Sequence, residues 1–213
     1  MRSVSRTIGV DGESDSDSAA FSFKTGTALL VVDLQNDFAD PRGSLYIEGA
    51  SELIAPANAY VRLAKQARAM IGYTQDWHPA HTPHFAQDGG IWPVHCVAES
   101  WGAQFVPNLV VDGDVFRKGT GGEDGYSGFS VRDVGTGETR STDLGAALSR
   151  SGIRLIAICG VATDYCVKET ALDAMELGYE VVVLTDAIRA VDRHRGDGDR
   201  ALQVMRRAGI RCV

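Results

Sequence analysis

The sequence predicts a three-layer α/β/α protein, in which helices cover both faces of a central, mostly parallel sheet. Short continuous apolar runs are typical of strands that are buried on both faces; examples are TALLVVD (27–33), RLIAIC (154–159) and EVVVLTD (180–186). Segments with apolar residues at helical spacing lie between such runs, so strand and helix alternate to the C-terminus. This alternation favours parallel strands joined by helical crossovers, with binding sites beyond the carboxyl ends of the strands.

Each element has its own signal in the sequence. After the first strand, apolar residues recur at helical spacing, a strand follows, and a loop rich in His, Pro and Gly separates it from a strand or strand pair broken at Gly113. A second loop precedes a helix with a capping residue, and three strands with two helices between them end the chain. Strands are expected at 27–33, 70–75, 108–118 (a strand or strand pair), 154–159, 180–186 and 210–213. Helices are expected at 50–70, 141–152, 163–178 and 199–209, and loops at 76–107 and 118–129.

The composition of the 213 residues narrows the function classes. There are 28 acidic and 21 basic residues and the net charge is -7, so no overall basic field favours nucleic acid or an anionic membrane as a partner. No apolar run approaches the roughly 20 residues of a membrane span, and the N-terminus lacks the apolar core of a signal peptide. We therefore expect a cytoplasmic protein. Its four scattered cysteines are expected to be free thiols.

The N-terminal segment differs from the rest of the chain. Residues 1–26 are polar, and the stretch DGESDSDS (11–18) holds four acids and no base. Such a composition cannot bury enough apolar area to offset the entropy lost on ordering. We expect a flexible acidic tail over 1–26 and a single domain over 27–213.

Three reactive side chains follow three of the expected strands. Asp33 ends the first strand, Lys118 follows another, and Cys166 lies in the first turn of the helix after residues 154–159. Parallel strands bring their carboxyl ends to one edge, so the three can converge. A cysteine attacks as thiolate, whose formation a lysine and a helix N-terminus favour, while a carboxylate can accept the proton. We assign Cys166 as nucleophile, Asp33 as general base and Lys118 as the cation that holds both.

Each of these residues also has an ordinary structural interpretation. A cysteine near a helix start is often a small buried apolar residue, which suits Cys159 better than Cys166. An aspartate at the end of a strand is often a turn or capping residue, and a single lysine is usually solvated.

A group of histidines has the spacing of metal ligands. Four of the five histidines lie within 18 residues, in DWHPAHTPHFAQDGGIWPVH. Asp76 and His78 are two residues apart, which places both on one face of an extended segment. His95 is a third candidate ligand and His84 a fourth, whereas His81 is expected either at the surface or behind a ligand, without touching the ion. The sequence predicts one divalent ion, Zn, Fe or Mn; the alternative is a loop of surface histidines.

Five ordered motifs together resemble the isochorismatase-like cysteine hydrolases and, within them, the nicotinamidases and pyrazinamidases. The resemblance runs from about residue 28 to the C-terminus, and the motifs are LLVVDLQNDF, DWHP, WPVHC, FRKG and GVATDYCV. It implies that Asp33, Lys118 and Cys166 form the catalytic triad. It also implies a cis peptide between Val161 and Ala162, and an oxyanion hole made by the backbone amides of Ala162 and Cys166.

The same resemblance implies the ligands and the substrate. Asp76, His78 and His95 match the metal ligands of the family, and His84 lies where some members have a further histidine. Phe38, Trp92 and Tyr126 match aromatic residues that wall a pyridine ring, whose nitrogen is expected to meet the metal. The implied reaction is hydrolysis of nicotinamide to nicotinate and ammonia in NAD salvage, with pyrazinamide as a second substrate.

Other functions stay open at this point. Another amidase of this fold could act on a carbamoyl or ureido compound, or the chain could act on isochorismate, although such relatives generally lack the Asp-x-His motif and the distal histidine. A protein of a different class would bind metal or sense redox state through the histidines and thiols without catalysis. The sequence leaves the oligomeric state open, a homo-oligomer included.

Overall fold

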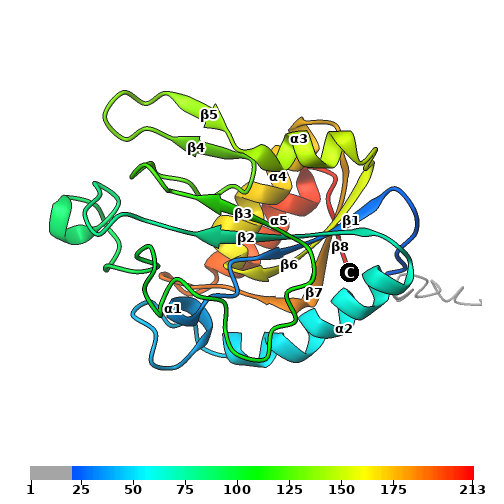
Figure 1. The fold of residues 1–213 in the computed structure, drawn as a ribbon, viewed down its shortest axis with the longest axis horizontal. Coiled ribbons are helices and arrows are strands. Elements are labelled where there is room, and N and C mark those ends of the chain that lie inside the picture. Colours follow the sequence, from blue (N-terminus) through cyan, green and yellow to red (C-terminus); the bar gives the residue numbers. More distant parts are fainter. Residues whose placement is uncertain (1–20) are drawn as a thin grey trace, which may run out of the picture.

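A parallel sheet of six strands forms the centre of the protein (Figure 1). The structure, a computed structural model, describes residues 21–213. The strand order is β3-β2-β1-β6-β7-β8, and every neighbouring pair is parallel. All carboxyl ends therefore lie at one edge. The strands are β1 (Thr27–Val32), β2 (Met70–Asp76), β3 (Asp114–Lys118), β6 (Leu155–Val161), β7 (Glu180–Arg189) and β8 (Arg211–Cys212).

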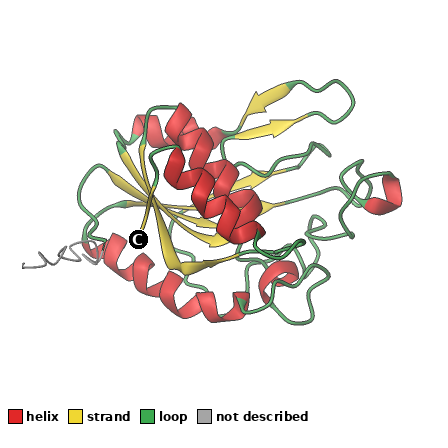
Figure 2. Ribbon diagram, turned by 180° about the vertical axis from the view of Figure 1, so that it is seen from behind, coloured by secondary structure: helices red, strands yellow, loops and turns green. Residues whose placement is uncertain are grey.

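Helices cover both faces of this sheet, as predicted. One face packs against α2, and the opposite face against α3, α4 and α5 (Figure 2). The helices are α1 (Asn36–Ala39), α2 (Ile54–Gln66), α3 (Asp143–Arg150), α4 (Lys168–Glu176) and α5 (Asp197–Arg207), with short helical turns η1 (Ala50–Leu53), η2 (Ala86–Asp88) and η3 (Thr163–Val167). Among the described helices, none has both the length and the apolar character that a membrane span needs.

The alternation of side chains along the strands produces two cores. In β1, Leu29 and Val31 point to the α2 side, whereas Leu30 and Val32 point to the side of α3, α4 and α5. All six residues of β1 are buried, which is why its sequence is a continuous apolar run. The capping prediction for α3 is confirmed, because Thr142 Oγ1 accepts a hydrogen bond from the Leu144 amide at 3.3 Å.

Two segments differ from the sequence-based prediction. Residues 108–112 form no strand, because the chain there runs outside the sheet and the exposed Val110 and Val111 have no strand partner among the described residues. An antiparallel hairpin, β4 (Ser130–Arg132) and β5 (Thr139–Ser141), was not predicted. Its strands have three residues each, too few for the period-2 pattern to show.

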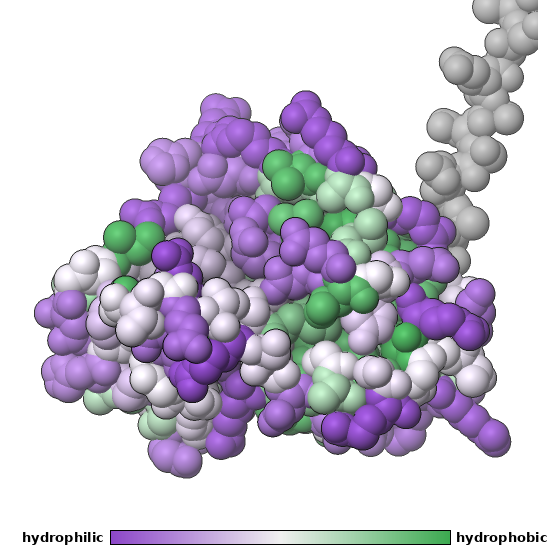
Figure 3. Space-filling model, turned by 90° about the horizontal axis from the view of Figure 1, so that it is seen from above, coloured by the Kyte–Doolittle hydropathy of each residue, from purple (hydrophilic) through white to green (hydrophobic). Residues whose placement is uncertain are grey.

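The predicted tail lies mainly outside the described residues, which begin at residue 21. Phe23, however, is buried and packs edge-on against Tyr60 of α2 at a centroid distance of 6.5 Å. The core of the domain therefore includes residues before Thr27. The face shown in Figure 3 carries mostly hydrophilic side chains with small apolar areas between them.

Candidate active site

The carboxyl edge of the sheet brings the predicted reactive residues together. Asp76 ends β2 and pairs in register with Lys118, which ends β3. Asp33 follows β1 with a φ of 50°, in the left-handed region that residues with a Cβ seldom adopt. Gly160 lies where β6 meets the end of β1, and a Cβ there would be 2.1 Å from the Val32 carbonyl oxygen. Only glycine allows this close approach.

Asp33, Lys118 and Cys166 form one buried group. Lys118 Nζ lies 2.9 Å from Asp33 Oδ2 and 3.6 Å from Cys166 Sγ. The ammonium also donates to Asp76 Oδ1 and, at 3.3 Å, to the carbonyl of Gly125. Thr74 Oγ1 donates to Asp33 Oδ1 at 2.7 Å and fixes that carboxylate. Lys118 is only 2% exposed, so the interpretation of a solvated lysine is wrong.

The charges in this group define its resting state. Burial raises the pKa of the Cys166 thiol well above its ordinary value; the Lys118 charge opposes this, but the Asp33 and Asp76 charges add to it. Burial alone would lower the pKa of Lys118, yet Asp33 and Asp76 raise it well above its usual range. Asp33 and Asp76 therefore favour the charged form of the lysine, whereas burial and the same two carboxylates favour the thiol form of Cys166. The Lys118 charge favours the thiolate, as predicted, but it acts against burial.

The segment after β6 presents the thiol. The Val161–Ala162 peptide is cis, as the resemblance implied. The π-helical turn η3 follows at once and carries Cys166, before α4 begins. Ala162 and Cys166 both line the same pocket.

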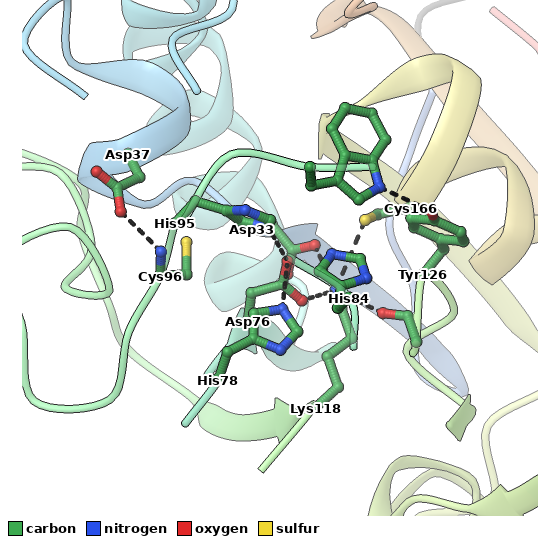
Figure 4. Close-up of polar contacts among 12 residues, drawn as sticks. Asp33, Asp37, Asp76, His78, His84, His95, Cys96, Lys118, Tyr126 and Cys166 are labelled. Atoms are coloured by element: carbon green, nitrogen blue, oxygen red, sulfur yellow. Dashed lines mark hydrogen bonds and ion pairs between the residues drawn. The ribbon is translucent and has the colours of Figure 1, made fainter. Parts of the chain in front are cut away.

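Three histidines converge beside the triad (Figure 4). Ligand atoms of His78, His84 and His95 all lie within 4.8 Å of one another. Asp76 Oδ2 is 3.7 Å from His78 Nε2 and 3.8 Å from His95 Nε2. Asp76 thus turns one oxygen to Lys118 and the other to the histidines. His81 is exposed and pairs with Asp88 at 3.2 Å, away from this cluster.

These residues fit a divalent ion. Neither ring nitrogen of His78 has a hydrogen-bond partner among residues 21–213, although the side chain is buried, and an ion would satisfy the nitrogen that carries the lone pair. Burial lowers the pKa of His95 to about 4, so its ring is neutral at pH 7, as a ligand must be. Imidazoles and a carboxylate suit Zn, Fe or Mn.

A small pocket opens between the thiol and the histidines. The empty volume of the pocket, including its open mouth, is about 400 Å³. The predicted aromatic residues Phe38, Trp92 and Tyr126 all line it, and Trp92 Nε1 donates to the Tyr126 hydroxyl at 2.9 Å. Such apolar walls with a few polar groups suit a small planar ligand.

Several residues of this pocket were not predicted from the sequence. Tyr165 lines it and packs edge-on against Trp92 at 4.9 Å, and Leu45, Ile47 and Val191 complete the wall. The position of Tyr165 directly before Cys166 was the available signal. The others come from loops whose course the sequence pattern does not define.

A buried amide holds the metal-binding side of the site in place. Gln35 Nε2 donates to the Asp76 carbonyl at 2.7 Å, and the Asp76 amide donates to Gln35 Oε1 at 2.8 Å. Asp37, also buried, accepts a hydrogen bond from the Cys96 amide at 2.7 Å and so fixes the chain next to His95.

Fold and site together define a hydrolase with a parallel α/β sheet, a buried thiol beside an ion pair, and a site suited to a divalent ion. The comparison with known families agrees: residues 27–213 match the isochorismatase domain, and the chain belongs to this family.

Relatives of known activity cover most of the chain. The nicotinamidase of Escherichia coli is 36% identical in an alignment of 200 positions that covers 85% of this chain and 92% of that protein. Among solved structures, the pyrazinamidase of Pyrococcus horikoshii in complex with zinc has a TM-score of 0.79 and 40% identity, covering 88% of this chain and 98% of that one. PnC1 from L. infantum in complex with nicotinate has a TM-score of 0.82 and 35% identity, covering 91% and 95%.

Proposed function

We propose that the protein hydrolyses nicotinamide to nicotinate and ammonia through a thioester on Cys166. The observation that carries this proposal is that Cys166, which contacts the Lys118–Asp33 ion pair, lines one pocket with His84, His95 and the predicted aromatic residues. A thiol, a proton acceptor and a planar slot are the parts that hydrolysis of a small aromatic amide requires.

In the first half of the reaction, Asp33 accepts the Cys166 proton as Sγ adds to the amide carbonyl carbon. Asp33 Oδ2 is paired by charge with Lys118 at 2.9 Å, and its carboxylate lies within 4.8 Å of the thiol. The backbone amides of Ala162 and Cys166 would hold the oxyanion. Asp33 then passes the proton to the amide nitrogen, the C–N bond breaks and ammonia leaves.

In the second half, water attacks the thioester. Asp33 takes a proton from the water as its oxygen adds to the carbonyl carbon, the C–S bond breaks, and Cys166 regains the proton. Lys118 stays protonated throughout and offsets the charges of Asp33 and Asp76. Its full burial makes that ammonium effective in both halves, because little water screens it.

The metal site would help to bind the aromatic ring of the substrate. Asp76, His78, His84 and His95 would hold a divalent ion, which supplies a Lewis acid for a lone pair of the substrate or of water. Phe38, Trp92 and Tyr126 would hold the ring plane and exclude solvent. The similarity to a pyrazinamidase bound to zinc and to a protein bound to nicotinate supports both the ion and the pyridine acid.

Ammonia release from a panel of amides tests this proposal. The purified protein, loaded with Zn²⁺, Fe²⁺ or Mn²⁺, should act on nicotinamide and pyrazinamide. It should act at least tenfold more slowly on benzamide, which lacks the ring nitrogen. Turnover of a carbamoyl compound without turnover of nicotinamide would refute the substrate and favour the other amidases of this fold.

A further inference from the structure

Asp124 is an acidic residue that the proposed reaction does not use. It lies in the loop between β3 and β4, and its carboxylate Oδ1 is 2.7 Å from Nδ1 of His84. A carboxylate only accepts hydrogen bonds at neutral pH, so the proton of the neutral His84 ring lies on Nδ1. The lone pair is then on Nε2, the other ring nitrogen.

The three histidines of the cluster differ in this respect. His95 Nδ1 donates to the Pro93 carbonyl at 2.8 Å, and the ring of His78 has no hydrogen-bond partner among the described residues. Among the described residues, His84 is the one of the three with a carboxylate within hydrogen-bond distance, because Asp76 Oδ2 is 3.7 Å from His78 and 3.8 Å from His95. A carboxylate behind a histidine ligand fixes the tautomer, orients the ring and raises the basicity of the ligating nitrogen.

The backbone of Asp124 is held independently of its side chain. Its amide donates to the Arg132 carbonyl at 2.8 Å, and the Arg132 amide donates to the Asp124 carbonyl at 2.6 Å. This bridge ties the loop to β4, the hairpin strand that the sequence did not predict. Removing the carboxylate therefore leaves the loop anchored.

The charge balance of the site gives a second argument. Asp33 and Asp76 carry two negative charges, and Lys118 neutralises one of them. The carboxylate of Asp124, whose side chain is 38% exposed, adds a further negative charge beside His84. These charges favour a cation at the histidine cluster, and solvent weakens the contribution of Asp124.

We propose that Asp124 is a positioning residue for the metal centre: its carboxylate holds His84 as the Nδ1–H tautomer and delivers Nε2 as a ligand of the ion. This inference rests on the metal centre of the proposed function, and it is independent of which amide is the substrate.

A titration of metal-free protein with Co²⁺ tests the proposal, with visible absorption reporting the ligand set and a chelator competition reporting affinity. Asp124→Ala should weaken Co²⁺ binding by roughly 10- to 100-fold. Its Co²⁺ spectrum should resemble that of His84→Ala. Asp124→Asn should lose less, because the amide oxygen still accepts a hydrogen bond, and it serves as the second variant if Asp124→Ala does not fold.

Two controls separate positioning from other effects. His81→Ala removes the exposed imidazole that pairs with Asp88 outside the cluster, and it should leave Co²⁺ affinity unchanged. In a His84→Ala background, Asp124→Ala should have no further effect, because the residue through which it acts is gone.

Three results would overturn the inference. Asp124→Ala that binds Co²⁺ within twofold of the wild type would show that the carboxylate does not position His84. An equal loss with and without His84 would show an effect of charge alone. Wild-type protein that binds no Co²⁺ would refute the metal centre as well, whereas the amide assay tests the substrate separately.

Discussion

The triad and the histidine cluster lie side by side but are built in different ways. Asp33 follows β1 and Lys118 ends β3, the two strands on either side of β2, and Cys166 lies in the turn that follows β6. Their polar atoms are paired with one another. His78, His84 and His95 come from the long segment between β2 and β3, and both ring nitrogens of His78 lack a hydrogen-bond partner among residues 21–213.

The folded chain alone pairs the polar atoms of the triad, whereas the polar atoms of the histidine cluster need a bound ligand. Sheet register alone places Asp76 opposite Lys118, so the triad side of the site is assembled without a bound group. The histidine side is a buried polar cluster that is only partly satisfied by protein atoms, a costly arrangement unless something binds there. The four changes below separate the two sides, in order of decreasing expected effect.

Replacement of the nucleophile should have the largest effect. Cys166→Ala should lower kcat by about 10⁴-fold or more, about 5.5 kcal/mol in activation free energy, because no thioester can form. Co²⁺ affinity and the melting temperature should stay near wild type, since the thiol is not part of the histidine cluster. Cys212→Ala, which removes a partly buried thiol near the C-terminus, is the control and should keep full activity. Ammonia release at wild-type rate from Cys166→Ala would remove this residue from the mechanism.

Loss of the central cation should destabilise the fold. Lys118→Met leaves the buried carboxylates of Asp33 and Asp76 without a counter-charge, which should cost roughly 3–5 kcal/mol in the free energy of unfolding. Urea denaturation measures this. Lys65→Met breaks an exposed ion pair with Asp112 and should cost less than about 1 kcal/mol. Equal costs for the two variants would mean that the buried network contributes no more than a surface pair.

Metal addition should stabilise the protein through the histidine side. At an ion concentration about 100-fold above Kd, the gain is about 2.7 kcal/mol, or roughly 5–10 °C in Tm for a domain of this size. Differential scanning fluorimetry of metal-free protein should show this rise with Zn²⁺. It should vanish in His78→Ala and persist in His81→Ala, whose side chain is exposed. A rise that survives in His78→Ala would place the ion elsewhere.

A crowded glycine should have the smallest of the four effects. Gly119 has a φ of +76°, and a Cβ there would lie 2.5 Å from Cε1 of His78. Gly119→Ala should displace that ring and weaken Co²⁺ binding by roughly tenfold, about 1.4 kcal/mol. Gly152→Ala is the matched control, because its φ is +62° but no atom lies within 4 Å of the added Cβ. If both variants bind Co²⁺ as the wild type does, the contact with His78 has no influence on the site.

Much of the fold was predictable from the sequence because three strands of the sheet interior, β1, β6 and β7, contain continuous apolar runs. The runs that became β1, β6 and β7 were recognised for that reason, and the helices between them by their spacing. The β4–β5 hairpin was missed because its strands are short and mostly exposed. Residues 108–112 were wrongly predicted as a strand, because the apolar pair Val110 and Val111 suggested a buried strand, whereas both side chains are exposed.

The site was predictable to the extent that topology determines it. Asp33, Asp76 and Lys118 follow strands, so parallel pairing alone predicts that they meet. Contacts between loops could not be predicted from the sequence. The hydrogen bond between Asp124 and His84, for example, joins positions 40 residues apart in two irregular segments. The raised pKa of the Cys166 thiol depends on its burial, which neither the motif nor the spacing of the residues predicts.

One carboxylate, that of Asp76, belongs to both halves of the site: Oδ1 accepts from Lys118, and Oδ2 faces His78 and His95. A redesign that exchanges the ion, or removes it, therefore alters the electrostatic neighbourhood of the ammonium that serves the sulfur. A substitution that changes the charge in either half of the site therefore also changes the other half, through the side chain of Asp76.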